Sequence, residues 1–163
     1  MSLHYIIDGY NVVKQALPWV DMPLEGARNS FLEFIRNEQL CGSLRNKITV
    51  VFDGRQDYFS LGSVRQDYSG LCVVFSSGES ADDAILEILN KSSNAKNIIV
   101  ISDDRALRLS ARSYGAQLMG VREFLGKADK TVKYTVKDNC DKLSISEEKK
   151  INEELRKIWL KEK

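Results

Sequence analysis

The sequence contains little histidine and cysteine, which excludes several kinds of catalytic and metal site. His4 is its one histidine, so a His-dependent triad or a histidine-based nuclease mechanism has little to work with. The three cysteines, Cys41, Cys72 and Cys140, lie far apart with no Cys-x-x-Cys spacing, which disfavours both a zinc site and a disulfide framework. Cysteines without disulfide partners fit a reducing setting, so we expect a cytoplasmic protein.

The sequence also lacks an excess of charge of one sign and any long apolar run. Lys and Arg number 24 and Asp and Glu number 23, so no global field attracts a polyanion and such a partner must be held locally. Residues 127–163 carry eleven basic and eight acidic residues, so the positive excess lies in this tail. No window approaches the roughly 20 apolar residues of a membrane span, and no signal peptide is evident. We therefore expect a protein that is neither secreted nor embedded in a membrane.

Short apolar runs that alternate with helical periodicity are the dominant pattern. Such runs are typical of buried strands. Strands that alternate with helices usually pair in parallel through right-handed crossovers, so the sequence predicts an α/β fold. The predicted strands are Tyr5–Ile7, Ile48–Phe52, Leu71–Phe75 and Ile98–Ile101, with a short fifth at Gln117–Met119. The predicted helices lie around Phe31–Leu40, Ala81–Leu89 and Leu107–Tyr114, with a short one at Val121–Leu125.

Two segments depart from this alternation. Gly54–Gly70 is polar and contains the sequence RQDY twice, and we interpret it as a long loop or a twisted hairpin. Residues 1–126 are predicted to form one compact domain and residues 127–163 an extension. Within the extension, Thr131–Val136 is a candidate edge strand, and Ser144–Glu147 resembles a capping box that opens a charged helix reaching Trp159. This helix either docks on the domain, contacts a second copy or a ribonucleoprotein partner, or serves as a basic arm for RNA.

Acidic residues follow each predicted core strand. Ligands of an open parallel sheet gather at the carboxyl ends of its strands, so these side chains are expected to meet at one edge. Crowded carboxylates repel one another unless protons or cations neutralise them, and Mg²⁺ and Mn²⁺ prefer oxygen ligands. Such an ion can activate water and stabilise a phosphodiester under attack, which predicts metal-dependent hydrolysis. The acids are Asp8, Asp53, Asp103 and Asp104 at strand ends, and Glu79, Asp82 and Asp83 at the start of the helix that follows the third strand.

Each acid taken alone also has a purely structural explanation. Asp83 stands three residues after Ser80, which is typical of a helix cap, and Asp104 can satisfy the N-terminus of the next helix. We therefore favour Asp82 and Asp103 for chemistry.

Arginines and aromatic residues provide candidates for contacts with a substrate. Arg105, Arg108 and Arg112 are spaced i, i+3 and i+7, which places three guanidinium groups on one helix face. Arginine binds two phosphate oxygens at once, although a solvated helix face has the same pattern. Candidates for stacking on unpaired bases are Tyr10, Tyr58, Phe59 and Tyr68.

Five motifs in this order resemble those of YacP-like NYN domains, which are PIN-like nucleases. They are YIIDGYNV at residues 5–12, VVFDG at 50–54, VVFS at 73–76, ESADDAI at 79–85 and VISDD at 100–104. The resemblance covers roughly residues 4–126 and implies a Rossmann-like three-layer α/β/α fold with a mostly parallel sheet. It also implies a metal-dependent endoribonuclease that uses Mg²⁺ or Mn²⁺ on RNA, with single-stranded RNA as the expected substrate.

The resemblance also assigns roles to individual residues. Asp8 matches the first-strand acid of the family, Asn11 the polar residue near it, Asp82 the acid of the Ser-Ala-Asp motif and Asp103 the acid of the Ser-Asp motif. Asp53 falls where an acid is common, as a ligand or an orienting residue. Asp83 and Asp104 depart from the family pattern because they double the expected acids, so either member of each pair is a candidate metal ligand.

Three other functions compete with a nuclease. An RNA-binding module could retain the fold without turnover. A phosphoacceptor receiver domain needs an acidic pair after its first strand, but Gly9 follows Asp8. A haloacid-type phosphatase needs Asp-x-Asp there, and the sequence has Asp8-Gly9-Tyr10 instead.

Overall fold

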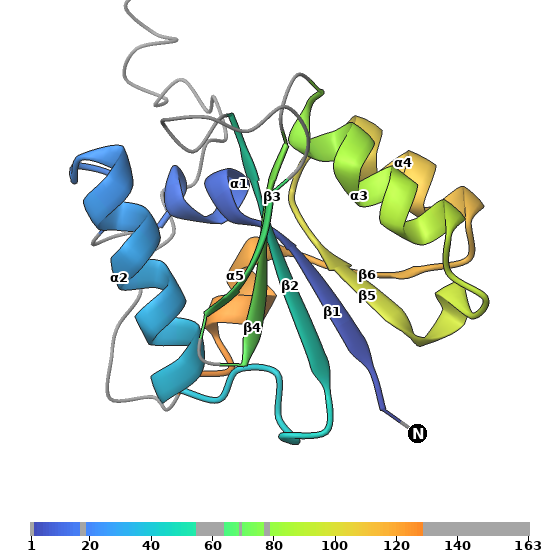
Figure 1. Cartoon of the computed structure of the whole chain (residues 1–163), viewed down its shortest axis with the longest axis horizontal. Helices are drawn as coiled ribbons and strands as arrows, with labels where there is room; N and C mark the ends of the chain where they lie inside the picture. Colours follow the sequence, from blue (N-terminus) through green and yellow to red (C-terminus); the bar gives the residue numbers. More distant parts are fainter. Residues whose placement is uncertain (1, 17–18, 55–63, 69, 77–78, 129–163) are drawn as a thin grey trace, which may run out of the picture.

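The computed structural model describes residues 2–16, 19–54, 64–68, 70–76 and 79–128 (Figure 1). The expected strand at Thr131–Val136, the helix reaching Trp159 and the aromatic candidates Tyr58 and Phe59 lie outside the described residues. The domain boundary at residue 126 stays a prediction as well, although Ala128 still belongs to the hydrophobic core.

A single sheet of six strands forms the centre of the molecule, in the order β3-β4-β2-β1-β5-β6. Five strands pair in parallel, as the alternating pattern predicted, and β3 is an antiparallel edge strand. All four predicted core strands and the short fifth strand are confirmed. The strands are β1 (His4–Asp8), β2 (Lys47–Asp53), β3 (Val64–Tyr68), β4 (Leu71–Ser76), β5 (Ile98–Ile101) and β6 (Gln117–Met119).

The segment Gly54–Gly70 contributes the one antiparallel strand among the described residues. Val64 pairs with Phe75 and Tyr68 with Leu71, so β3 forms a hairpin with β4, a strand outside this segment. The sequence predicted a loop or a hairpin of the segment alone and did not predict this pairing. Residues 55–63 lie outside the described part of the chain.

Helices cover both faces of the sheet, which gives the three-layer α/β/α arrangement seen in Figure 1. One face packs against α1 (Gly9–Val13), α2 (Leu24–Asn37) and α5 (Val121–Leu125), and the other against α3 (Ala81–Asn90) and α4 (Arg105–Ser113). A short 3₁₀ helix, η1 (Ala95–Asn97), precedes β5. No helix among the described residues is long and apolar enough to cross a bilayer.

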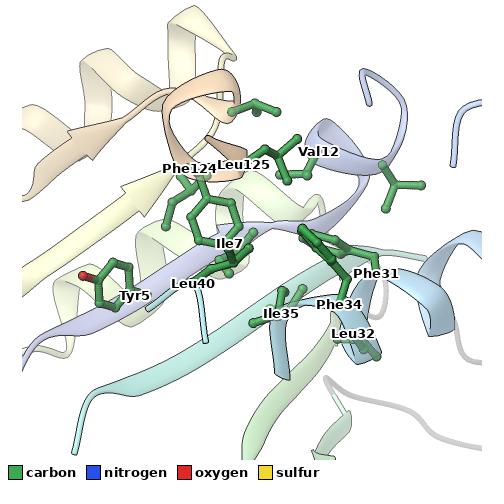
Figure 2. Close-up of a cluster of buried hydrophobic side chains, with 14 of the residues drawn as sticks. Tyr5, Ile7, Val12, Phe31, Leu32, Phe34, Ile35, Leu40, Phe124 and Leu125 are labelled. Carbon is green, nitrogen blue, oxygen red and sulfur yellow. The ribbon is translucent and has the colours of Figure 1, made fainter. Parts of the chain in front are cut away.

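Strand side chains alternate between two hydrophobic clusters, one on each face. Ile7 and Phe52 belong to the cluster under α1, α2 and α5, whereas Ile6 and Val51 belong to the cluster under α3 and α4. Figure 2 shows Ile7 among side chains of the first cluster, with Phe31, Ile35 and Phe124 around it. Burial on both faces explains why the sequence shows continuous apolar runs and not a polar–apolar alternation.

The direction of the connections places a crevice at one edge of the sheet. β1 and β5 are neighbours, but α1 and α2 after β1 lie on one face and α4 after β5 lies on the other. The chain therefore leaves the carboxyl ends of these two strands in opposite directions, which is the topology that creates ligand sites in open α/β sheets.

Candidate functional site

A cavity of about 500 Å³ opens at the carboxyl edge of the sheet and brings together acids from four separate chain segments. Asp8 ends β1, Asp53 ends β2, Asp82 lies in the first turn of α3, and Asp104 is the N-cap of α4. The other described residues that line it are Tyr10, Asn11, Lys14, Leu24, Gly54, Ser80 and Ala81. We call this cavity the acidic pocket.

Asp8 is the most buried acid of the acidic pocket, with 7% of its surface exposed. Its Oδ1 accepts a hydrogen bond of 3.1 Å from the backbone N–H of Asn11, and its Oδ2 accepts one of 3.1 Å from the hydroxyl of Ser102. Burial raises the pKa of Asp8 to about 6. The two hydrogen bonds lower this pKa, and repulsion from the carboxylates of Asp82 and Asp104 raises it. The carboxylate is thus held in place at a site whose burial disfavours its charged form.

Asp82 and Asp83 are neighbours in sequence but have different surroundings. Burial raises the pKa of Asp82, and the carboxylates of Asp104, Asp83 and Asp53 raise it further. Asp83 accepts a 2.7 Å hydrogen bond from the Ser80 hydroxyl and completes a capping box at the start of α3. Asp82 lines the acidic pocket and Asp83 does not. The structure therefore places Asp82, the residue of this pair that the sequence favoured, beside the other acids.

Asp103 and Asp104 are arranged differently from the sequence expectation. Asp104 lines the acidic pocket while its Oδ1 accepts a 2.8 Å bond from the backbone of Leu107. Asp103 does not line the pocket, and its Oδ1 accepts a 3.1 Å bond from the backbone N–H of Val121 at the start of α5. The geometry therefore favours Asp104 as the fourth acid, and the choice of Asp103 stays a prediction.

Asn11 connects the two sides of the crevice. Its Oδ1 accepts 2.8 Å hydrogen bonds from the backbone N–H of Asp103 and from the side-chain amide of Gln15. Because two donors already occupy this oxygen, the side chain is better placed to position the loop after β5 than to bind an ion.

Two buried serines hold acids of the pocket, and neither was predicted from the sequence as a site residue. Ser76 donates a 3.1 Å hydrogen bond to Asp53, and Ser102 donates to Asp8 while its oxygen accepts the backbone N–H of Asp104 at 3.1 Å. Each serine directly follows an apolar run, and Asp53 and Ser76 are register partners in β2 and β4. A polar residue at the end of a buried strand was the available signal.

The three predicted phosphate-binding arginines lie together but outside the acidic pocket. Arg105, Arg108 and Arg112 line a second cavity of about 320 Å³ with Leu109 and Leu118, which we call the arginine groove. Arg108 also donates a 2.9 Å hydrogen bond to the carbonyl of Ser102. Among the described residues that line the acidic pocket, Lys14 is the only one with a basic side chain.

The donor set of the acidic pocket fits Mg²⁺ or Mn²⁺. None of its four carboxylates forms an ion pair with the described Lys and Arg residues, and two have raised pKa values. No three described His, Cys, Asp or Glu side chains stand close enough to enclose an ion by themselves. A closed cage is not required, because Mg²⁺ usually keeps several waters and binds through one or two carboxylates plus substrate phosphate.

The raised pKa of Asp8 predicts a pH dependence of stability in the absence of metal. The folded protein holds this proton up to about pH 6, whereas the unfolded chain loses it near the ordinary value of 3.8. Ionisation of Asp8 therefore lowers the free energy of unfolding as the pH rises from about 4 through 6, by up to about 3 kcal/mol. We expect Asp8→Asn to be more stable than the wild type at pH 7.5 in EDTA, with a difference that shrinks below pH 5.

Urea unfolding at pH 5, 6 and 7.5 in EDTA measures this effect. Asp21→Asn is the matched control, because Asp21 is exposed and lies outside the acidic pocket. Equal stability of Asp8→Asn and the wild type at every pH would show that the ionised Asp8 carboxylate does not destabilise the folded protein.

Comparisons with known proteins identify one family and one similar fold. Residues 5–162 match the family described as the YacP-like NYN domain. The fold is similar to crystal structures of Rae1 (YacP) from Bacillus subtilis, with a TM-score of 0.62 to a W164L mutant and 0.61 to a second structure. Both are 21% identical to this chain and cover 97% of it, and the matched parts are 84% and 82% of their own chains. A search of curated proteins found no match.

Proposed function

This chain belongs to the YacP-like NYN domain family of PIN-like nucleases, and from this membership we propose that it is a metal-dependent endoribonuclease acting on single-stranded RNA. The observation that supports the proposal most is the acidic pocket itself. Four carboxylates from four chain segments converge at the switch point of the sheet, with no ion pair among the described residues to neutralise them. Such a pocket is suited to divalent cations bound against a polyanion.

We assign the metal ligands from the geometry. Mg²⁺ or Mn²⁺ would bind one or two of Asp8, Asp82 and Asp104 directly and the rest through waters, and Asp53, held by Ser76, would orient such a water. Asp103 remains the alternative to Asp104, and Asp83 is assigned to the helix cap. When bound, the metal would lower the pKa of the attacking water and neutralise negative charge on the phosphodiester.

The protein's own residues would hold these ligands in position. Ser102 and the backbone N–H of Asn11 orient the two oxygens of Asp8, and Ser102 also binds the backbone of Asp104. The side chain of Asn11 links the loop after β5 to α1. We assign Arg105, Arg108 and Arg112 to phosphates of the RNA strand outside the acidic pocket, along the arginine groove.

An endonuclease assay tests the proposed function. The substrate is a single-stranded RNA blocked at both ends, incubated with full-length protein in Mn²⁺ or Mg²⁺ and, separately, in EDTA. We expect internal cleavage only with metal, and its loss in Asp8→Asn, because that variant lacks the charge of the most buried ligand. Asp21→Asn, which changes an exposed carboxylate outside the pocket, should cleave like the wild type.

The assay also separates nuclease from binding module. Cleavage that persists in EDTA, or equally in Asp8→Asn, would contradict the metal site. RNA binding without cleavage under any metal condition would instead support a binding module of the same fold, a function with which the separate arginine groove is also compatible.

Three further expectations stay proposals. The division into a nuclease domain at residues 1–126 and an extension at 127–163 is one of them. Contact of the extension with a second copy or a ribonucleoprotein is another, and the cytoplasmic location is the third.

A further inference from the structure

The acidic pocket has two chemically different walls. The acids occupy the ends of β1 and β2 and the starts of α3 and α4, whereas Tyr10, Lys14 and Leu24 line the pocket from the segment between β1 and β2. The proposed chemistry uses only the acidic wall. An aromatic ring, an ammonium group and an exposed aliphatic side chain are left without a role beside it.

Tyr10 is held firmly but remains open to the pocket. Its ring centroid lies 5.0 Å from that of Phe52 at a tilt of 60°, and Phe52 is fully buried. The Tyr10 ring is half-buried, so one part packs on the core while another faces the cavity. An aromatic ring fixed in this way can stack on a base with little loss of side-chain freedom.

Leu24 exposes an aliphatic surface at the same pocket. It is the first residue of α2, 55% of its surface is accessible, and it is one of few large apolar residues among those described that are so exposed. Contact with a flat apolar ligand would remove this surface from water, which is favourable. A nucleobase has such a face.

Lys14 supplies a positive charge that can bind the phosphate of a nucleotide. Its Nζ lies 5.6 Å from the centroid of the Tyr10 ring, so ring and ammonium form one continuous surface. A phosphate is repelled by the four carboxylates of the acidic wall, and Lys14 is the basic side chain among the described lining residues that can attract it.

We propose that Tyr10, Lys14 and Leu24 form a nucleotide subsite, which takes the unpaired base and the phosphate next to the bond that is cut. This inference rests on the proposed function and deepens it, because it states why the substrate must be single-stranded. A base inside a duplex is stacked on its neighbours and has no free face to place against Tyr10 and Leu24. An entering nucleotide exchanges the contact between Lys14 and Tyr10 for a base stack and an ammonium–phosphate contact.

Binding to a fluorescent RNA tests the nucleotide subsite without requiring cleavage. The probe is a short single-stranded RNA with 2-aminopurine, whose fluorescence falls on stacking, added to full-length Asp82→Asn protein in Mg²⁺. We expect quenching in this background, and a roughly 5- to 100-fold weaker Kd after Tyr10→Leu, the order of magnitude for losing a base stacked on an aromatic ring. Leu24→Ala should weaken binding less, because it removes only apolar contact area. Lys14→Gln should weaken binding and lower the salt dependence by about one phosphate contact.

Each variant has a matched control outside the pocket. Tyr114→Leu, Leu44→Ala and Lys96→Gln change exposed residues of the same types and should leave the Kd unchanged. Melting temperatures identify any loss of folding in Tyr10→Leu, and Leu24→Ala keeps the test valid because that side chain is largely exposed.

An RNA with one abasic position provides the decisive comparison. If the nucleotide subsite takes a base, removing that base should cost wild-type binding as much as Tyr10→Leu, and should cost the Tyr10→Leu protein little more. Equal Kd values and equal quenching in the subsite variants and their controls would overturn the inference. Base-dependent binding without metal-dependent cleavage would support the subsite and refute the nuclease, so the two failures are distinguishable.

Discussion

Asp82→Asn is expected to reduce RNA cleavage on the order of 10³-fold, the size associated with losing a charge-stabilising group at an active site. Asp82 lines the acidic pocket, and its raised pKa reflects partial burial and the nearby carboxylates of Asp104, Asp83 and Asp53. Asparagine keeps the shape of the side chain but removes the charge that would bind a divalent cation. The same change relieves repulsion, so we expect the metal-free variant to melt at a temperature no lower than the wild type.

Asp83→Asn, one residue further along α3, serves as the matched control with the opposite signature. Asp83 accepts hydrogen bonds from the hydroxyl and the backbone N–H of Ser80 and does not line the pocket. Its replacement should cost about 1 kcal/mol of stability through the weakened cap and leave cleavage close to that of the wild type. Cleavage rates and melting temperatures of both variants are the measurements. Equal loss of cleavage in both would contradict the assignment of Asp83 to the cap.

The central part of the fold was predictable because strands that are buried on both faces have a simple sequence pattern. Strands covered by helices on both faces need apolar residues at every position, so β1, β2, β4 and β5 stand out as continuous runs. The antiparallel edge strand β3 was not predictable in the same way. Its sequence, VRQDY, has no apolar run, and its place is determined by pairing with β4 across a turn at Gly70.

The convergence of the acids was predictable, but the choice within each pair was not. The carboxyl ends of parallel strands meet at one edge, so a strand-end position alone predicts proximity for Asp8 and Asp53. Asp103 and Asp104 both follow β5, and their contacts with α5 and α4 decide which side chain lines the pocket. Here α5 engages Asp103 through Val121, and Asp104 is left facing the other acids. A sequence contains no local signal for that long-range contact.

Gly9→Ala is expected to cause the largest loss of stability, because the residue after Asp8 has no room for a side chain. A Cβ at this position would lie 2.3 Å from Cε1 of Phe52. That ring cannot move freely, since it is fully buried between Tyr10 at 5.0 Å and Phe75 at 5.9 Å between ring centroids. Overpacking of this kind typically costs about 1–3 kcal/mol and occasionally more, which corresponds to a drop in melting temperature of about 2–12 °C.

Gly26→Ala is the matched control for this substitution. Its Cβ would meet only Cε of Met22 at 3.7 Å, an ordinary contact, and in the first turn of α2 alanine is favoured over glycine by at most roughly 0.5–1 kcal/mol. We therefore expect thermal unfolding to show opposite shifts for the two glycines. Phe52→Leu should recover part of the loss in the Gly9→Ala protein, and additive effects of the two changes would contradict the steric explanation. Because Tyr10 packs on the same ring, displacement of Phe52 should also weaken RNA binding at the nucleotide subsite, which links the close packing beneath Asp8 to the surface that faces the substrate.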